Sequence, residues 1–472
     1  MCPAGFRRRR RGLTRLLFHT WIFAVFFAAV YPVYLLVKGT RFRNPWLLTA
    51  SYVFYAWWNP LYLLLIVYST LLDYLVVLWM AKSRRRRAWL AVSIVNLALL
   101  GFFKYGAFVT NNFNGALDAL GLTYQLPAPG VLLPVGISFY TFQSMSYTID
   151  FYRGQIEREP SFIRFATFVS LFPQLVAGPI ERAKNLLPQL YGNPRVSAQD
   201  VTDGLSLFVV GLFKKVVVAD YLARYVDSVY AAPDQFKSSA LFLATFAFGW
   251  QIYCDFSGYT DMARGIARLM GYRLMLNFNN PYLATGLGDF WARWHISLST
   301  WFKDYVYVPL GGNRKGTFST YRNMFLTMII SGLWHGAAWH FVVWGALHAV
   351  GRVVTRELER SPFYEQRVPK FLKQLMVFLF VTFTWVFFRA DSVGQACRIV
   401  YRIVTSGWAD PAFPLVALGL AFSLWVYQFL YESRARGLLE LAPVRVACVI
   451  GMLLSIAVFA GSGDQPFIYF QF

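Results

Sequence analysis

Two histidines in this chain have surroundings suited to proton-transfer chemistry. The first, His335, lies in a run (residues 323–351) that contains no Lys, Arg, Asp or Glu. A charge at the centre of a membrane span costs roughly 2.5 to 3.5 kcal/mol on insertion scales, so a histidine in such a run is expected to stay neutral. A neutral imidazole can accept a proton. The sequence therefore makes His335 a candidate general base inside a membrane.

The second histidine, His295, follows a break in the chain at Pro281, Gly286 and Gly288. From residue 287 to residue 305 large apolar side chains recur at helical spacing, with polar ones opposite. This pattern predicts one aromatic amphipathic helix at a membrane interface or lining a funnel, with His295 at the edge of its apolar stripe. On the same helix, Asp289 and Arg293 are expected to pair at i, i+4.

Structural explanations compete with these functional ones. His335 could be a histidine bonded to a neighbouring helix, and His295 a histidine at the membrane interface. Asp255 and Asp261 could simply pair with Arg264 or Arg268, and the Gly178-Pro179 step is best explained as a helix break. Neither the other histidines nor the four cysteines show metal-ligand spacing, so no metal site is predicted.

Composition points to an all-α polytopic membrane protein. Of the 472 residues, 57% are hydrophobic and only 14% charged, and the mean hydropathy is +0.44. About 20 apolar residues cross a bilayer, which predicts about eleven transmembrane helices in a single integral-membrane domain, residues 1–472. The predicted segments are 17–37, 46–58 continuing through 60–81, 88–104, 129–148, 162–180, 203–222, 238–270, 323–350, 371–389, 411–431 and 445–461.

The net charge of +22 is distributed in short clusters beside apolar runs, a pattern that argues against nucleic-acid binding. The positive-inside rule places the clusters at residues 82–87, 352–360 and 434–445 on the cytoplasmic side. One conflict concerns the first apolar run, which basic residues flank on both sides, at 7–11 and at 38–43. That run is interpreted as an uncleaved span rather than a signal peptide.

Five ordered sequence strings resemble those of the membrane-bound O-acyltransferase (MBOAT) family. The likeness is greatest to its bacterial alginate O-acetyltransferase-like branch, and it extends from FYAWWNP at 54–60 to PFIYF at 466–470. The strings are LPVGISFYTFQ at 133–143, LFPQLVAGPI at 171–180, DFSGY at 255–259, FWARWHISLS at 290–299 and LWHG at 333–336.

The resemblance implies a multi-helix fold around a central funnel or tunnel, in which His335 and His295 correspond to the family's two motif histidines. It also implies an O-acetyltransferase of the bacterial cytoplasmic (inner) membrane, with acetyl-CoA as donor substrate and no tightly bound cofactor. The implied partners are an extracytoplasmic acetyltransferase, a cell-surface polysaccharide, or both. The final acceptor stays open among alginate, cellulose, peptidoglycan and other glycans.

Acyl transfer to a hydroxyl needs a base, which contributes about 10² to 10⁴ in rate. His335 is the predicted base, and Trp334 and Trp339 are expected to wall the site against water. Supporting roles, in orienting the acyl oxygen or the base and in lining the tunnel, are predicted for His295, Asn279, Ser257, Trp291, Arg293 and Asp289.

Two other classes of protein remain open from the residues alone. A proton-coupled transporter or flippase would use His335 as a proton relay, and a scaffold of a polysaccharide-secreting machine would need no base. The shortage of acidic residues inside the long apolar runs favours the acyltransferase over the transporter.

Overall fold

The computed structural model describes residues 16–83, 86–131, 133–459 and 467–468, and these residues form helices and loops without a β-strand. The basic cluster at residues 7–11 lies outside the described residues. The first half of the chain forms α1 Trp21–Val37, α2 Arg43–Ala56, α3 Tyr62–Lys82, α4 Arg86–Ala119, α5 Ile137–Tyr152, α6 Phe162–Ser170, α7 Phe172–Leu175, α8 Ala183–Tyr191, α9 Ala198–Phe213, the π-helix η1 Lys214–Ala219 and α10 Asp220–Ala231.

After the 3-10 turn η2 Pro233–Gln235, the second half contains the longest buried helix and several short ones. Its elements are α11 Ser238–Leu269, the 3-10 turn η3 Pro281–Leu283, α12 Leu287–Arg293, α13 Ile296–Phe302, the π-helix η4 Lys303–Tyr307, α14 Gly316–His335, α15 Trp339–Glu359, α16 Pro362–Arg367, α17 Lys370–Arg389, α18 Val393–Thr405, α19 Leu415–Glu432, α20 Arg436–Glu440 and α21 Ala442–Phe459.

Five helices in the described ranges are long and apolar enough to cross a membrane: α3, α4 from Trp89, α17, α19 and α21. The prediction of an all-α membrane protein is confirmed. The number of eleven crossings stays a prediction, because several predicted segments are divided between shorter helices. Residues 162–180, for example, form α6, the single turn α7 and a loop.

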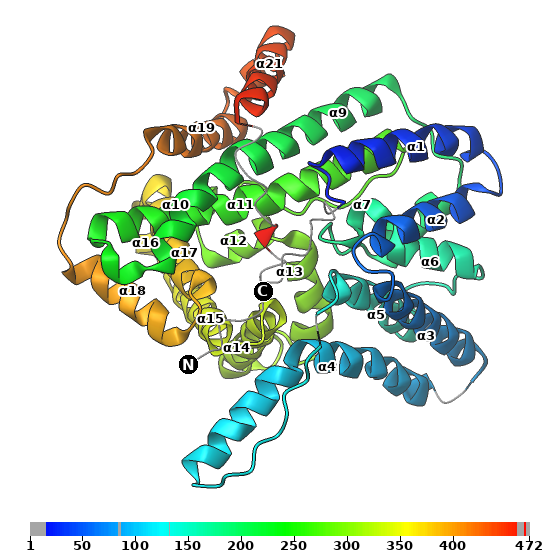
Figure 1. Cartoon of the computed structure of the whole chain (residues 1–472), viewed down its shortest axis with the longest axis horizontal. Helices are drawn as coiled ribbons and strands as arrows, with labels where there is room; N and C mark the ends of the chain where they lie inside the picture. The colour runs from blue at the N-terminus through cyan, green and yellow to red at the C-terminus, as the bar shows by residue number, and fades with distance from the viewer. Residues whose placement is uncertain (1–15, 84–85, 132, 460–466, 469–472) are drawn as a thin grey trace.

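The short helices α12 and α13 lie at the centre of the molecule. Seen down the shortest axis, longer helices surround them, with α9 and α11 above and α14 and α15 below (Figure 1). Since α12 ends just before His295 and α13 begins just after it, the fold surrounds this histidine with helices from most of the chain.

Glycine pairs hold α9 against α11. A Cβ added to Gly258 would come within 2.7 Å of the Gly211 carbonyl oxygen, and one added to Gly265 within 2.6 Å of the Gly204 carbonyl oxygen. Small residues allow membrane helices to approach this closely, which replaces the hydrophobic driving force that lipid does not supply. The contact fixes α11 as the central support of the fold.

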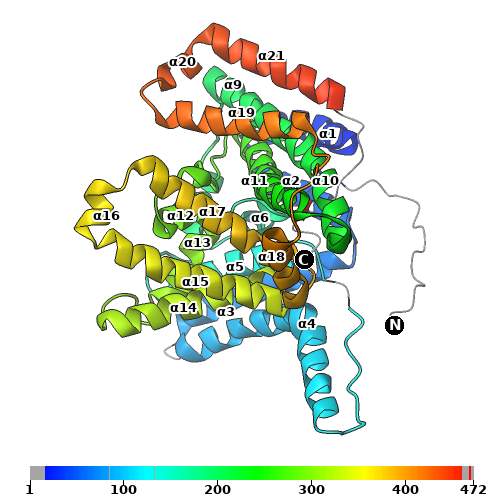
Figure 2. The same ribbon diagram turned by 90° about the vertical axis from the view of Figure 1, so that its left-hand side faces the viewer.

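Two of the predicted cytoplasmic clusters lie on one side of the molecule. The short helix α16 follows the basic end of α15, and α20 contains Arg436. Both helices lie at the left edge in Figure 2. This shared position supports the prediction that residues 352–360 and 434–445 face the same side of the membrane.

The predicted single span at residues 323–350 is wrong, because the structure divides it into α14 and α15. The chain leaves the helix at Gly336 and begins the next one at Trp339. The two helices run antiparallel in close contact: a Cβ on Gly332 would overlap the Phe341 carbonyl, and one on Gly345 would overlap the Met328 carbonyl. His335 is therefore the last residue of a helix, at the tip of a hairpin, rather than in the middle of a span.

Candidate functional site

The side chain of His335 is enclosed by aromatic rings. Only 5% of the residue is exposed. Its ring centroid lies 5.0 Å from that of Trp334, 5.1 Å from that of Trp344 and 5.2 Å from that of Phe388, each in edge-to-face geometry. The enclosure combines residues of α14, α15 and α17, and it excludes bulk water from the imidazole.

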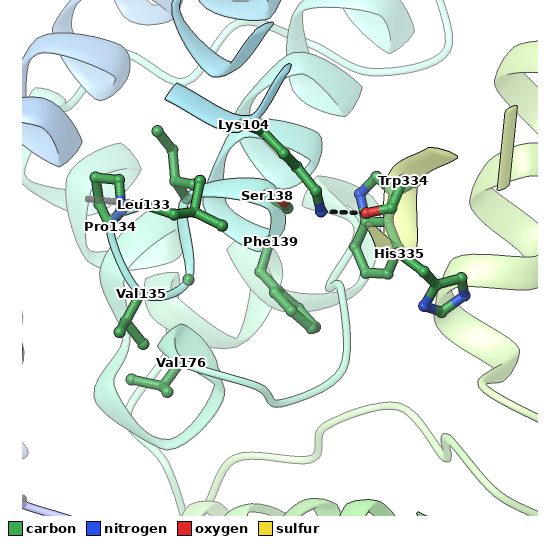
Figure 3. A pocket seen from close by; sticks show the side chains of 11 residues that line it. Lys104, Leu133, Pro134, Val135, Ser138, Phe139, Val176, Trp334 and His335 are labelled. Atoms are coloured by element: carbon green, nitrogen blue, oxygen red, sulfur yellow. Dashed lines mark hydrogen bonds between the residues drawn. The ribbon is translucent and has the colours of Figure 1, made fainter. Parts of the chain in front are cut away.

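A cavity of about 110 Å³ adjoins His335. Figure 3 shows the Lys104 ammonium hydrogen-bonded to the Trp334 carbonyl, with the His335 ring beyond Trp334 and pointing away from the other labelled lining residues. The volume suits an acetyl group, and it is well below the roughly 300–1,000 Å³ of pockets that hold drug-sized ligands. The lining residues are Lys104, Leu133, Pro134, Val135, Gly136, Ile137, Ser138, Phe139, Val176, Trp334 and His335.

The predicted continuous helix around His295 is wrong. His295 has φ 42° and ψ 54°, the left-handed conformation, and this residue separates α12 from α13. Local periodicity could not reveal the break, because a neighbouring loop stabilises it. The Asn277 carbonyl accepts the Ile296 N–H at 2.9 Å, and the Asn277 side chain accepts the Ser297 N–H at 3.2 Å.

The imidazole of His295 is fully buried, with 0% exposure. Its centroid lies 4.6 Å from the Phe256 ring, 6.3 Å from the Phe139 ring and 6.0 Å from the Trp334 ring. Trp334 therefore contacts both His295 and His335. The structure brings together the two predicted catalytic histidines and one of the two predicted wall residues, Trp334.

Ser297 connects two of the strings noted in the sequence, 171–180 and 290–299, to the loop after α11. Its hydroxyl donates to the Asn277 side-chain oxygen at 3.0 Å and accepts the Ile180 N–H at 3.0 Å. The loop after α7 and the loop after α11 are thereby fixed to the start of α13. Neither Asn277 nor Ser297 was among the predicted site residues, although Ser297 lies within the string at 290–299.

Three predicted residues form a polar cluster elsewhere. Arg293 pairs with Asp289 at 2.7 Å, as predicted, and also with Glu432 of α19. The Asn279 N–H donates to the Arg293 carbonyl at 2.9 Å. None of these three residues is among those that line the described cavity. Their contacts tie α12 to α19.

The remaining predicted site residues are Trp291, Ser257 and Trp339, and the structure places them differently with respect to the two histidines. Trp291 contacts Trp344 at 5.8 Å, one ring away from His335. Ser257 is buried in α11, next in sequence to Phe256. Trp339 is 57% exposed, and its indole donates to Asn112 at 2.8 Å. The structure therefore does not bring Trp339 into the described cavity.

His340 and His348, which lack metal-ligand spacing in the sequence, make contacts on α17. His340 Nδ1 lies 2.9 Å from the Phe387 carbonyl oxygen, and His348 Nε2 lies 3.0 Å from the Thr384 hydroxyl. His348 also packs on Trp344 at 4.7 Å. It is thus separated from His335 by one indole ring.

Asp255 and Asp261 form ion pairs, but mainly with lysines. Asp255 pairs with Lys215 at 2.7 Å, and Asp261 pairs with Lys214 at 2.8 Å and with Arg264 at 3.6 Å. The lysines come from η1, and this long-range pairing left no local pattern in the sequence. The contacts support a structural role for both carboxylates.

Glu181 is a buried acid outside the long apolar helices. It is 0% exposed, and its carboxylate accepts the Met275 N–H at 2.5 Å. Burial raises the pKa of Glu181 to about 8, although the Met275 N–H and the charge of Arg264 act in the opposite direction. The segment that follows the predicted span at 162–180 therefore begins with a side chain inside the protein.

Comparison with known proteins identifies the family. The model of the MBOAT, membrane-bound O-acyltransferase family, matches residues 148–393, just over half of the chain. The chain belongs to this family and is an acyltransferase.

Several curated relatives are similar over most of the chain. It is 37% identical over 490 residues to "Probable alginate O-acetylase AlgI" of Pseudomonas putida, covering 97% of this chain and 100% of the relative. It is 34% identical over 523 residues to "Peptidoglycan O-acetyltransferase" of Helicobacter pylori, covering 97% and 98%. "Teichoic acid D-alanyltransferase" of Bacillus subtilis is 27% identical over 235 residues, covering 48% and 59%.

Proposed function

We propose that the protein transfers an acetyl group from acetyl-CoA to a hydroxyl on the extracytoplasmic side, with His335 as general base. The observation that carries the proposal is the position of His335, which is buried among aromatic rings and adjoins a cavity of about 110 Å³. Such a site accepts the reacting acetyl group while it excludes the water that would hydrolyse a thioester.

In the proposed reaction, the acceptor hydroxyl oxygen attacks the thioester carbonyl carbon. The new C–O bond forms, the C–S bond breaks, and His335 takes the hydroxyl proton and returns it to the leaving thiolate. A positioned base of this kind contributes about 10² to 10⁴ in rate. His295, which also contacts Trp334, is proposed to orient the acyl oxygen or the base.

The hairpin supports transfer across the membrane. His335 lies at its tip, and Arg352, Arg356 and Arg360 lie at the other end of α15. The 21 residues of α15 are about 30 Å long, so its basic end lies far from the tip. The exposed Trp339 at the tip fits a membrane–water interface, where Trp is enriched. We infer that the polyanionic donor approaches from the basic side and the acceptor from the tip.

The acceptor is proposed to be a cell-surface glycan, or a partner that passes the acetyl group on to one. This part of the proposal is supported by the names of the relatives, which include an alginate O-acetylase and a peptidoglycan O-acetyltransferase. The same names favour a transferase over the transporter hypothesis, in which a solute would cross the membrane chemically unchanged.

Sealed membrane vesicles from the native host test the proposal. Inside-out vesicles supplied with [1-14C]acetyl-CoA should accumulate label on glycan in their lumen, whereas right-side-out vesicles should not. Equal labelling of both would contradict the direction of transfer. A labelled solute that enters unchanged, with no labelled glycan, would favour the transporter.

A further inference from the structure

The C-terminal end of α14, which positions His335, is capped by side chains of α4. The Tyr105 hydroxyl donates to the Leu333 carbonyl oxygen at 2.8 Å, and the Lys104 ammonium donates to the Trp334 carbonyl oxygen. Residues 104 and 334 are far apart in the sequence, so this capping is a tertiary contact. It acts on the two residues directly before His335.

Helix geometry explains why this cap matters. The last carbonyls of a helix have no partner within the helix, and leaving a buried carbonyl without a hydrogen bond costs about 1–3 kcal/mol. The chain cannot supply local partners for both, because Gly336 turns away with an extended backbone, ψ 151°. A cation near a helix C-terminus is also favourable, since that end has partial negative charge.

The Lys104 side chain makes a second contact with the same residue. Its ammonium lies 5.4 Å from the centroid of the Trp334 ring, within cation–π range. Lys104 therefore holds both the carbonyl and the indole of Trp334, and Trp334 in turn contacts both histidines. Both Lys104 and His335 line the cavity of about 110 Å³ (Figure 3).

We propose that Lys104, assisted by Tyr105, is a positioning residue for His335: it fixes the end of α14 so that the imidazole meets the acetyl group. The inference rests on the proposed function of His335 as base. A displacement of about 1 Å in an active site can reduce the rate about 100-fold. Because α4 precedes residue 148, this residue lies outside the segment that matches the family model.

Lys104→Met tests the inference, with Lys104→Arg as the charge-retaining variant and Tyr105→Phe as the variant that removes only a hydroxyl. Lys82→Met, at the exposed end of α3, is the matched control. The maximal rate of [1-14C]acetyl transfer and the half-saturating acetyl-CoA concentration are measured in native-host inside-out vesicles, per mole of inserted protein, together with the melting temperature in detergent.

The proposal predicts that Lys104→Met lowers the maximal rate about 10- to 100-fold while the half-saturating concentration changes less than about threefold. Tyr105→Phe should lower the rate about fivefold, as expected for one hydrogen bond. Lys104→Arg should restore most of the rate, and Lys82→Met should match the wild type. In a His335→Ala background, Lys104→Met should cause no further loss, since it acts through His335.

Two outcomes would overturn the inference while leaving the proposed function intact. One is normal transfer by Lys104→Met when His335→Ala is inactive. The other is a loss of rate that is accompanied by an equal loss of melting temperature and is not restored by arginine. Normal transfer by His335→Ala would instead reject the proposed function itself.

Discussion

The rings of His295 and His335 lie against the same indole, that of Trp334, at centroid separations of 6.0 and 5.0 Å. One histidine directly precedes α13 and the other ends α14. Both are thus held at helix ends, where the backbone direction changes, and a single tryptophan sets their spacing. Substitutions at these two positions can therefore test the imidazole rings separately from the changes in backbone direction that position them.

At His295, we expect Asn and Ala substitutions to differ in stability but not in activity. The residue has φ 42°, which Asn tolerates and which costs Ala roughly 1–2 kcal/mol. His295→Asn should therefore melt near the wild-type temperature and His295→Ala several degrees lower. Both should lose acetyl transfer, measured as label on glycan. A fully active His295→Asn protein would show that the imidazole is dispensable.

Trp339→Phe is expected to leave the transfer rate within about twofold of wild type, because the residue is 57% exposed and its indole contacts Asn112 and Phe108 rather than the cavity. Trp334→Phe is the comparison, since Trp334 is 4% exposed and contacts both histidines. It should lower the rate at least about tenfold, as expected for a displaced catalytic group. A larger effect at Trp339 than at Trp334 would contradict the site described above.

Arg293→Met should affect stability rather than chemistry. The guanidinium joins Asp289 of its own helix to Glu432 of α19, and these side chains are partly exposed, so each pair contributes modestly. We expect the melting temperature to fall by roughly 2 to 4 °C with an unchanged rate per folded molecule. Asp289→Asn should behave similarly. A loss of rate without a loss of stability would place Arg293 in the catalytic machinery.

The pH dependence of stability should reveal Glu181. Burial raises its pKa from 4.5 to about 8, so between these values the folded protein keeps a proton that the unfolded chain has released. Glu181 therefore lowers stability progressively as pH rises through that window, and the effect levels off above it. Glu181→Gln keeps an acceptor for the Met275 N–H and removes this penalty.

The measurement for Glu181 is the melting temperature in detergent at a series of pH values. The difference between Glu181→Gln and the wild type should grow from pH 4.5 to about 8. Glu157→Gln, at an exposed position, serves as control and should show no such trend. A difference for Glu181→Gln that is the same at every pH would exclude a buried, protonated carboxyl.

Apolar composition sufficed to predict a helical membrane protein, and the motif strings sufficed to select His335 and His295. The hairpin break was missed because residues 336–338 are as apolar as their neighbours, although Gly336 is a usual helix-terminating residue. The left-handed backbone at His295 depends on Asn277, which is distant in the sequence. Lys104 was missed because it lies at the end of a predicted span but inside the longer α4.

The most direct test of the account is acetyl transfer by His335→Ala in inside-out vesicles supplied with [1-14C]acetyl-CoA. His340→Gln serves as control, because His340 contacts the Phe387 carbonyl rather than the cavity. We predict that His335→Ala inserts normally and loses at least about 100-fold in rate, as expected for loss of a general base, while the control stays active. Wild-type labelling by correctly inserted His335→Ala would contradict the account.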